Sequence, residues 1–188
     1  MKPELEMLAK TYYDTPIGTL EIGATENGIG KACFVDYPTY EVDPTHEHLL
    51  QCIEQLDEYF AGERVHFNLF LDQTGTEFQR RVWRELRNIP LGHTAAYLDV
   101  AKRIQSPEAV RAVGAACGAN KLWLLVPCHR VIGSNGKLTG YAAGLKRKRW
   151  LLEHESGILY GKQVRLLLPE RLRGIVCAWR HPGKRPYG

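Results

Sequence analysis

The sequence of 188 residues lacks the features that mark several large classes of protein. No apolar run approaches the roughly 18–20 residues of a membrane span, and the first residues are acidic and lack the apolar stretch of a signal peptide. There is no Cys-x-x-Cys pair, no glycine-rich phosphate loop and no convincing cluster with the spacing of metal ligands. We therefore expect no membrane segment, no metal ion and no cofactor.

Cysteine is scarce, and its number is odd. Because there is no secretory signal, the five cysteines favour free thiols in a reducing compartment, so we expect a cytoplasmic protein. A lone cysteine is more often a small buried hydrophobic residue than a nucleophile. We interpret four of the five in this way: Cys33, Cys52, Cys117 and Cys177.

Each part of the chain is poor in charge of one sign. Residues 1–72 hold 4 Lys and Arg against 14 Asp and Glu, a net charge of −10, whereas residues 73–188 hold 21 against 7, a net charge of +14. Solvated surface charge is the plain alternative, but the change of sign at one point in the chain argues against it. The asymmetry indicates that the second part meets a polyanion and the first does not.

The first part has the pattern of a small α/β unit, which we place at residues 1–72. Apolar and polar residues alternate at 19–24, and 31–35 suits a return strand. A helix is expected next, with Asp43 as N-cap and Pro44 in its first position. We see no chemistry in this unit.

The second part, residues 73–157, is expected to be mostly short helices. Thr76 and Gln79 match a capping box at the start of the first. Another helix is predicted near residues 97–104, and Ser106 with Pro107 is expected to begin the next. Two short helices joined by a tight turn are what a helix-turn-helix requires.

The turn signal at residues 134–137 suits a hairpin, interpreted as a wing. A last helix is expected from about residue 144 to Glu155. Residues 158–188 are basic and look like a loosely packed tail of unknown role. We weighed a nuclear signal in the basic run at 146–149 and gave it little weight.

Cys128 is the cysteine whose neighbours favour chemistry. His129 can take the proton of a thiol, and Arg130 adds positive charge that favours the thiolate. Adjacent side chains on a strand point to opposite faces, so contact between Cys128 and His129 needs a bend or a water molecule. Pro127 makes a bend reasonable.

Other residues extend this interpretation. Glu155 can orient His129 in a Cys–His–carboxylate relay, although it can equally be a charge at a helix end. Asn120 follows Gly-Ala and can satisfy backbone groups of a buried turn. Arg111 lies within an otherwise small, apolar helix, either solvated or pointing into DNA. Small neighbours would let that helix approach a groove closely without reading sequence: Ala112, Gly114, Ala115 and Ala116.

Taken together, these residues resemble the O6-alkylguanine-DNA alkyltransferases, also called methylated-DNA–protein-cysteine methyltransferases. The Pro-Cys-His-Arg-Val run is highly specific for this family when the other matching stretches accompany it. The stretches that carry the resemblance are residues 75–83, 89–92, 111–114, 126–133, 140–141 and 150–155, with a fainter match at 59–62.

The resemblance implies a ribonuclease-H-like α/β N-terminal domain and a winged helix-turn-helix C-terminal domain. It also implies direct-reversal DNA repair without a cofactor, in which the alkyl group of O6-alkylguanine, and of O4-alkylthymine, passes irreversibly to Cys128. The partner would be double-stranded DNA that carries the lesion, with the nucleotide flipped out. The chain would be a monomer that can assemble cooperatively on DNA, associated with the nucleoid if it is bacterial.

The resemblance also assigns roles to residues. His129, acting through a water molecule and together with Glu155, would activate Cys128. Asn120 would hold the turn that precedes Cys128. Tyr97 would rotate the nucleotide and protonate the leaving guanine, and Arg111 would fill the gap. The remaining residues would contact DNA or line the base pocket: Ala112, Gly114 and Ala115 for DNA, and Tyr141, Lys148 and Val131 for the pocket.

This chain departs from the family pattern at a few positions, and two other functions stay open. Lys121 replaces a proline, Leu98 a glycine, and Ala143 a glycine of the Gly-Tyr-x-Gly-Gly run, which would narrow the pocket. One alternative is a module that binds alkylated DNA without repairing it, although such relatives lack the cysteine. The other is a winged-helix transcription regulator in which Cys128 is structural or senses redox state.

Overall fold

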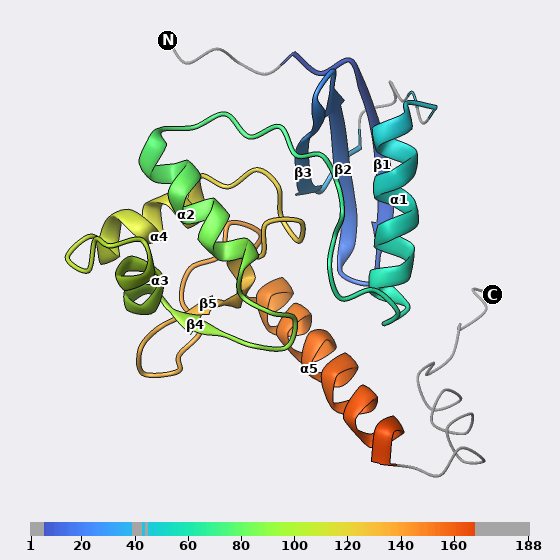
Figure 1. The fold of residues 1–188 in the computed structure, drawn as a ribbon. Helices are drawn as coiled ribbons and strands as arrows, with labels where there is room; N and C mark the ends of the chain where they lie inside the picture. The colour runs from blue at the N-terminus through green and yellow to red at the C-terminus, as the bar shows by residue number, and fades with distance from the viewer. Residues whose placement is uncertain (1–5, 39–42, 44, 168–188) are drawn as a thin grey trace.

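The computed structural model describes residues 6–38, 43 and 45–167 (Figure 1). Strands and one long helix are followed by a mostly helical part, as the sequence predicts, and the sheet has three strands. The elements in chain order are β1 (Ala9–Thr15), β2 (Gly18–Thr25), β3 (Gly28–Val35), α1 (Glu47–Phe60), α2 (Glu77–Arg87), β4 (Ala95–Ala96), α3 (Tyr97–Arg103), α4 (Val110–Gly118), the 3-10 turn η1 (Cys128–Arg130), β5 (Val131–Ile132) and α5 (Leu145–Leu167).

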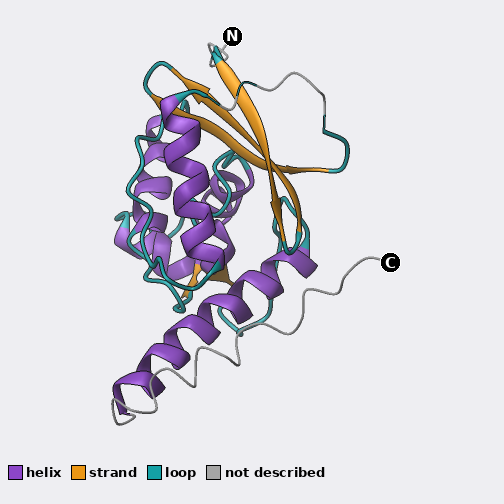
Figure 2. Cartoon of the chain, turned by 90° about the vertical axis from the view of Figure 1, so that its right-hand side faces the viewer, coloured by secondary structure: helices purple, strands orange, loops and turns teal. Residues whose placement is uncertain are grey.

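The N-terminal sheet is antiparallel in the order β1-β2-β3, and α1 lies beside it (Figures 1 and 2). The alternation seen in the sequence holds, because Leu20, Ile22 and Ala24 are all fully buried under α1 and the helical part. From α1, Leu49 and Leu56 complete this core. The strand β1 was not predicted, since its Lys-Thr-Tyr-Tyr-Asp run is too polar to show a clear alternation.

The start of α1 differs from the prediction. The helix begins at Glu47 with His46 as N-cap, not at Asp43. The Asp43 carboxylate instead accepts hydrogen bonds from the backbone nitrogen and the hydroxyl of Thr45, at 3.0 and 2.6 Å, so it closes a turn before the helix. Pro44 lies outside the described residues.

Two segments from later in the chain pair with β3, the edge strand of the sheet. The connection to α2 runs parallel to it, with Ile29 donating to Phe70 O at 2.8 Å and accepting from Asp72 N at 2.9 Å. Farther along, Ala32 donates to Lys121 O at 2.8 Å and accepts from Trp123 N at 2.9 Å. The sheet thereby fixes the segment that leads to Cys128.

The helical part begins as predicted. The Thr76 hydroxyl accepts from Gln79 N at 3.2 Å, and the Gln79 side chain accepts from Thr76 N at 2.9 Å, so the capping box is formed. Helices α3 and α4 are joined by a short turn in which Gln105 has a φ of +58°. The expected start of α4 is wrong, because Ser106 O accepts from Ala109 N at 2.9 Å in a turn and the helix begins at Val110.

The predicted wing is only partly formed. Gly133 donates to Lys137 O at 3.0 Å and accepts from Gly136 N at 2.9 Å, which closes the expected turn. However, β5 before the turn pairs in parallel with β4, and within the described ranges no strand follows the turn before α5. The turn is therefore present without the antiparallel hairpin that a wing would contain.

The last helix is longer than predicted, since α5 continues through Leu167 instead of ending near Glu155. Ile158 is buried, and Leu159 packs close to Gly92, so this extension of the helix begins with packed residues. The expected loose tail is thus wrong for residues 158–167, and residues 168–188 lie outside the described part. No helix within that part is long and apolar enough to cross a membrane.

Candidate active site around Cys128

Cys128 opens the 3-10 turn η1, and this turn supplies the bend that contact with His129 requires. Cys128 N donates to Val126 O at 2.8 Å, and Arg130 N donates to Pro127 O at 3.0 Å. Because the backbone turns here, consecutive side chains need not lie on opposite faces. Cys128, His129 and Arg130 are all buried.

Asn120 holds the loop in front of Cys128. Its amide nitrogen donates to Val126 O at 2.9 Å and to Cys128 Sγ at 3.3 Å, while its side-chain oxygen accepts from Leu122 N at 3.0 Å. The loop contains a buried leucine, Leu124, with a φ of +70°, a conformation that L side chains rarely adopt. The hydrogen bonds of Asn120 offset the strain of that conformation and fix the position of the sulfur.

Glu155 on α5 collects five hydrogen bonds in a fully buried position. Its Oε1 accepts from Tyr59 Oη at 2.9 Å and from Arg130 Nη2 at 2.9 Å, and it lies 2.8 Å from His129 Nε2. Its Oε2 accepts from Arg130 Nε at 2.9 Å and from Gly92 N at 3.3 Å. The expected pairing of Glu155 with His129 is present, and a helix-end charge in solvent is excluded.

The protonation states of this group follow from its contacts. Burial alone would raise the pKa of Glu155, but pairing with His129 and Arg130 outweighs it and holds that pKa well below its usual range. Burial lowers the pKa of His129, so the ring is neutral. Since the Glu155 carboxylate requires a donor, Nε2 carries the proton. Nδ1 is buried and unpaired within the described residues, so its lone pair can accept a proton.

The side chain of Cys128 is a protonated thiol at neutral pH, because its pKa is raised. Burial raises its pKa, while the hydrogen bond from Asn120 and the charge of Lys148 act in the opposite direction. The expectation that Arg130 favours the thiolate is wrong, because its guanidinium is engaged by Glu155 and by Ile89 O, at 2.5 Å from Nη1. To act as a nucleophile, Cys128 would therefore need a proton acceptor.

Lys148 is fully buried and ties three backbone carbonyls together. Its Nζ donates to Val131 O at 2.6 Å, Thr139 O at 2.8 Å and Gly140 O at 3.4 Å. It thereby fastens the loop before Tyr141 to β5, next to Cys128. Burial lowers the pKa of Lys148, and its three acceptors satisfy its donors.

Tyr141 lies beside this group with its phenol oxygen buried and unpaired in the described part of the chain. Its ring meets His129 edge-on, at 6.4 Å between centroids, and lies 6.1 Å from the ring of Trp123. A buried hydroxyl without a partner is costly, so this group is suited to a polar atom of a bound ligand. Ala143, in place of a glycine, is buried nearby in sequence.

Tyr97 begins α3, and Arg111 lies on α4. The phenol of Tyr97 pairs with the Thr139 side chain, and burial raises its pKa, so it keeps its proton at neutral pH. The Tyr97 ring lies close to α4: a Cβ atom added at Gly114 would be 3.9 Å from Cε1 of Tyr97. The outer face of α4 is exposed and small apart from its arginine: Arg111, Ala112, Ala115, Gly118 and Ala119.

Two contacts of Glu155, those with Tyr59 and with Arg130, were not predicted from the sequence. Tyr59 lies in the N-terminal unit, in which no chemistry was expected, yet it donates a hydrogen bond to Glu155. The faint family match at residues 59–62 was the only signal that pointed to it. Arg130 was singled out for its charge, but nothing in the sequence indicated its carboxylate partner.

The other cysteines that the structure describes are free thiols without a role in the site, in line with the interpretation that they are small packing residues. Cys52 and Cys117 are buried free thiols. Cys33 is half-buried and donates to Lys121 O at 3.3 Å. Cys177 lies outside the described residues. Within the described ranges, no three His, Cys, Asp or Glu side chains gather as metal ligands would.

Comparison with known proteins identifies this architecture. The family model described as 6-O-methylguanine DNA methyltransferase, ribonuclease-like domain, matches residues 8–73, and the model of the DNA binding domain of the same family matches residues 77–157. The class is therefore a two-domain protein with a helical DNA-binding domain. The chain belongs to the O6-alkylguanine-DNA alkyltransferase family.

Similar proteins cover most of the chain. The methylated-DNA–protein-cysteine methyltransferase of Mycolicibacterium paratuberculosis is 47% identical over 154 residues, which is 79% of this chain and 93% of the relative. The constitutive enzyme of Bacillus subtilis is 45% identical over 70% of this chain and 85% of its own length. The crystal structure of Mycobacterium tuberculosis OGT in complex with DNA has a TM-score of 0.70 at 41% identity, covering 78% and 92% of the two chains.

Proposed function

We propose that this chain repairs DNA by transferring the alkyl group of O6-alkylguanine to Sγ of Cys128. The observation that carries the proposal is the arrangement of Cys128, Asn120 and the His129–Glu155 pair in one buried site. A buried thiol with a raised pKa, beside a neutral histidine with a free ring nitrogen, suits attack on an alkyl carbon. The named activity of the relatives agrees with this chemistry.

Proton transfer to His129 accompanies the attack in this account. Nδ1 takes the thiol proton through one water molecule, while Glu155 stabilises the imidazolium that forms. The carbon–oxygen bond of the lesion breaks as the carbon–sulfur bond forms. The leaving guanine then needs a proton, and Tyr97 is suited to supply it because burial keeps its phenol protonated.

The target base must leave the duplex to reach a buried sulfur. Unstacking costs a few kcal/mol, and Arg111 on the exposed face of α4 would occupy the vacated space and offset part of this cost. Ala112 and Ala115 are exposed around it, and Gly114 lies beside Tyr97, so α4 is small enough to approach a groove closely. Tyr141, Val131 and Lys148 would line or support the pocket for the flipped base.

Further features of the function follow from the same chemistry. The product is a thioether, and the site has no means of hydrolysing it, so each molecule would act once. O4-alkylthymine presents the same kind of alkyl–oxygen bond and is expected as a second substrate. Action as a monomer with cooperative assembly on DNA, and association with the nucleoid, also remain predictions.

One variant and one binding comparison distinguish repair from the two alternatives. Cys128→Ala should abolish alkyl transfer while leaving affinity for a duplex with O6-methylguanine unchanged in a gel-shift titration. Transfer that survives the substitution would show that Cys128 is not the acceptor. Strong preference of the wild-type protein for one undamaged sequence would instead favour a transcription regulator.

A further inference from the structure

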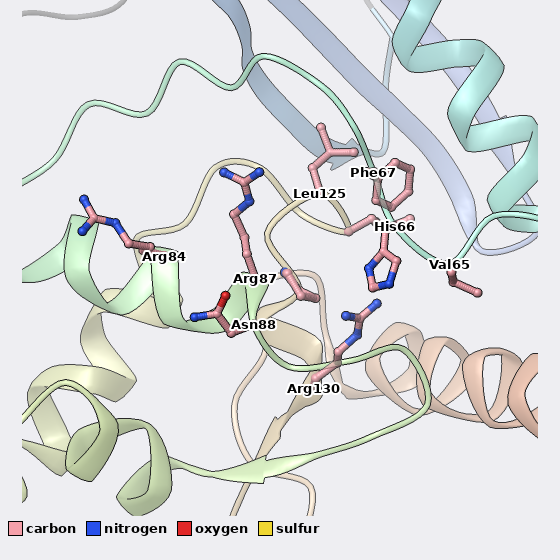
Figure 3. A pocket seen from close by; sticks show the side chains of 10 residues that line it. Val65, His66, Phe67, Arg84, Arg87, Asn88, Leu125 and Arg130 are labelled. Atoms are coloured by element: carbon pink, nitrogen blue, oxygen red, sulfur yellow. The ribbon is translucent and has the colours of Figure 1, made fainter.

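A pocket of about 300 Å³ lies outside the site around Cys128, where the two parts of the chain meet (Figure 3). One wall comes from the segment after α1, with His66 and Phe67. The C-terminal end of α2 contributes Arg84 and Arg87, and the run before Cys128 contributes Leu125. Figure 3 shows His66 and Arg130 pointing toward one another across this space.

The lining carries positive charge that no carboxylate in the lining balances. Arg84 and Arg87 are three residues apart on α2, so they lie on one face of the helix. Both are exposed, and within the described residues neither forms a hydrogen bond or an ion pair. By contrast, Arg80 on the same helix donates to Gly75 O at 2.8 Å.

The pocket also has an apolar side, and it connects to the site. Phe67 and Leu125 offer a surface on which a flat ring can lie. Arg130 reaches the pocket, while its Nε and Nη2 hold Glu155, both at 2.9 Å. A volume of about 300 Å³ is at the lower end of small-molecule sites.

We propose that this pocket binds a phosphate ester, with the phosphate on Arg84 and Arg87 and an attached ring against Phe67. One guanidinium group can donate two parallel hydrogen bonds to two oxygens of a phosphate, so arginine is the residue best suited to this contact. The phosphate can belong to a free nucleotide or to the DNA backbone. This second site goes beyond the proposed repair reaction and does not depend on Cys128.

The first experiment measures binding of deoxyadenosine 5′-monophosphate by calorimetry, with deoxyadenosine as the uncharged control. The nucleotide should bind at least about tenfold more tightly than the nucleoside, a difference of about 1.4 kcal/mol. The double variant Arg84→Gln/Arg87→Gln should remove this preference. The matched variant Arg80→Gln/Lys102→Gln, with exposed residues outside the pocket lining, should keep it.

A second experiment separates the two sources of phosphate. The affinity of the wild type and the pocket variant for undamaged duplex DNA is measured over a series of salt concentrations. If the ligand is a phosphate of the DNA backbone, the slope of log K against log[salt] becomes less steep by about one in the pocket variant, and the mononucleotide competes with DNA. If the ligand is a free nucleotide, the slope is unchanged. The proposal is overturned if neither the nucleotide affinity nor the slope depends on Arg84 and Arg87.

Discussion

The phenol of Tyr59 on α1 donates a hydrogen bond to Oε1 of Glu155 on α5, at 2.9 Å and in a fully buried position. The two residues are 96 positions apart in the sequence. The neighbouring residue His154 also contacts α1, because its Nε2 lies 3.1 Å from the backbone oxygen of Tyr59. The N-terminal unit therefore supports the carboxylate that orients His129, although it supplies no reacting group itself.

Replacing Tyr59 with phenylalanine tests this support. Hydrogen bonds to charged groups contribute about 1.5–3 kcal/mol, so Tyr59→Phe should lower the free energy of unfolding by about 2 kcal/mol in urea titrations. Single-turnover transfer should slow by less than about tenfold, because Arg130 and Gly92 still hold Glu155.

Tyr13→Phe is the matched control. Its phenol also donates to a carboxylate, that of Asp57, at 2.7 Å, but this pair is exposed and joins β1 to α1 without involving Glu155. It should cost at most about 1 kcal/mol and leave the transfer rate unchanged. Equal effects of the two substitutions on transfer would contradict a supporting role for Tyr59.

The charge of Glu155 should appear in the pH dependence of stability. Glu155→Gln leaves Arg130 buried without its counter-charge, which should cost about 3–5 kcal/mol at pH 7. Because the folded-state pKa of Glu155 lies below its ordinary value of 4.5, its contribution is complete above that pH and is lost as the pH falls further. The stability difference between the wild type and Glu155→Gln should therefore shrink from pH 5 downward, and a constant difference would contradict this pairing.

Lys148 should matter for both stability and the thiol. Lys148→Met keeps most of the volume but leaves the carbonyls of Val131, Thr139 and Gly140 without their donor, at a cost of about 2 kcal/mol. Removing the cation should also raise the pKa of Cys128, which alkylation by iodoacetamide over a pH series can follow. The neighbouring exposed Lys146→Met should change stability by less than about 0.5 kcal/mol and leave the thiol unaffected.

Arg111 should act only when the base lies in a duplex. Arg111→Ala should slow repair of a duplex with O6-methylguanine by about tenfold or more, while its reaction with free O6-benzylguanine keeps the wild-type rate. Each rate is measured under single-turnover conditions. If both reactions slowed equally, Arg111 would not fill the space left by a flipped nucleotide.

Much of the fold could be predicted because local patterns are strong in this chain. The alternation around Leu20 and the capping box at Thr76 both appear in the structure as expected. Two helix starts were predicted wrongly, because Asp43 and Ser106 form turns that resemble N-caps in the sequence. The end of α5 was missed because the sequence does not reveal that Ile158 is buried.

In the site too, some features could be predicted from the sequence and others could not. Cys128, His129 and Arg130 are neighbours in sequence, so their shared environment could be anticipated. The link from Glu155 to Tyr59 depends on how α1 packs against α5, and no local pattern records that packing. Arg130 shows the same limit, because its charge is visible in the sequence but its carboxylate partner is 25 residues away.

The central claim is tested most directly by the mass of the intact protein after incubation with a duplex that carries one O6-methylguanine, followed by peptide mapping. The account predicts a gain of one methylene group per molecule, located on Cys128, with no further turnover when more substrate is added. An unchanged mass, or a methyl group found on another residue, would contradict it.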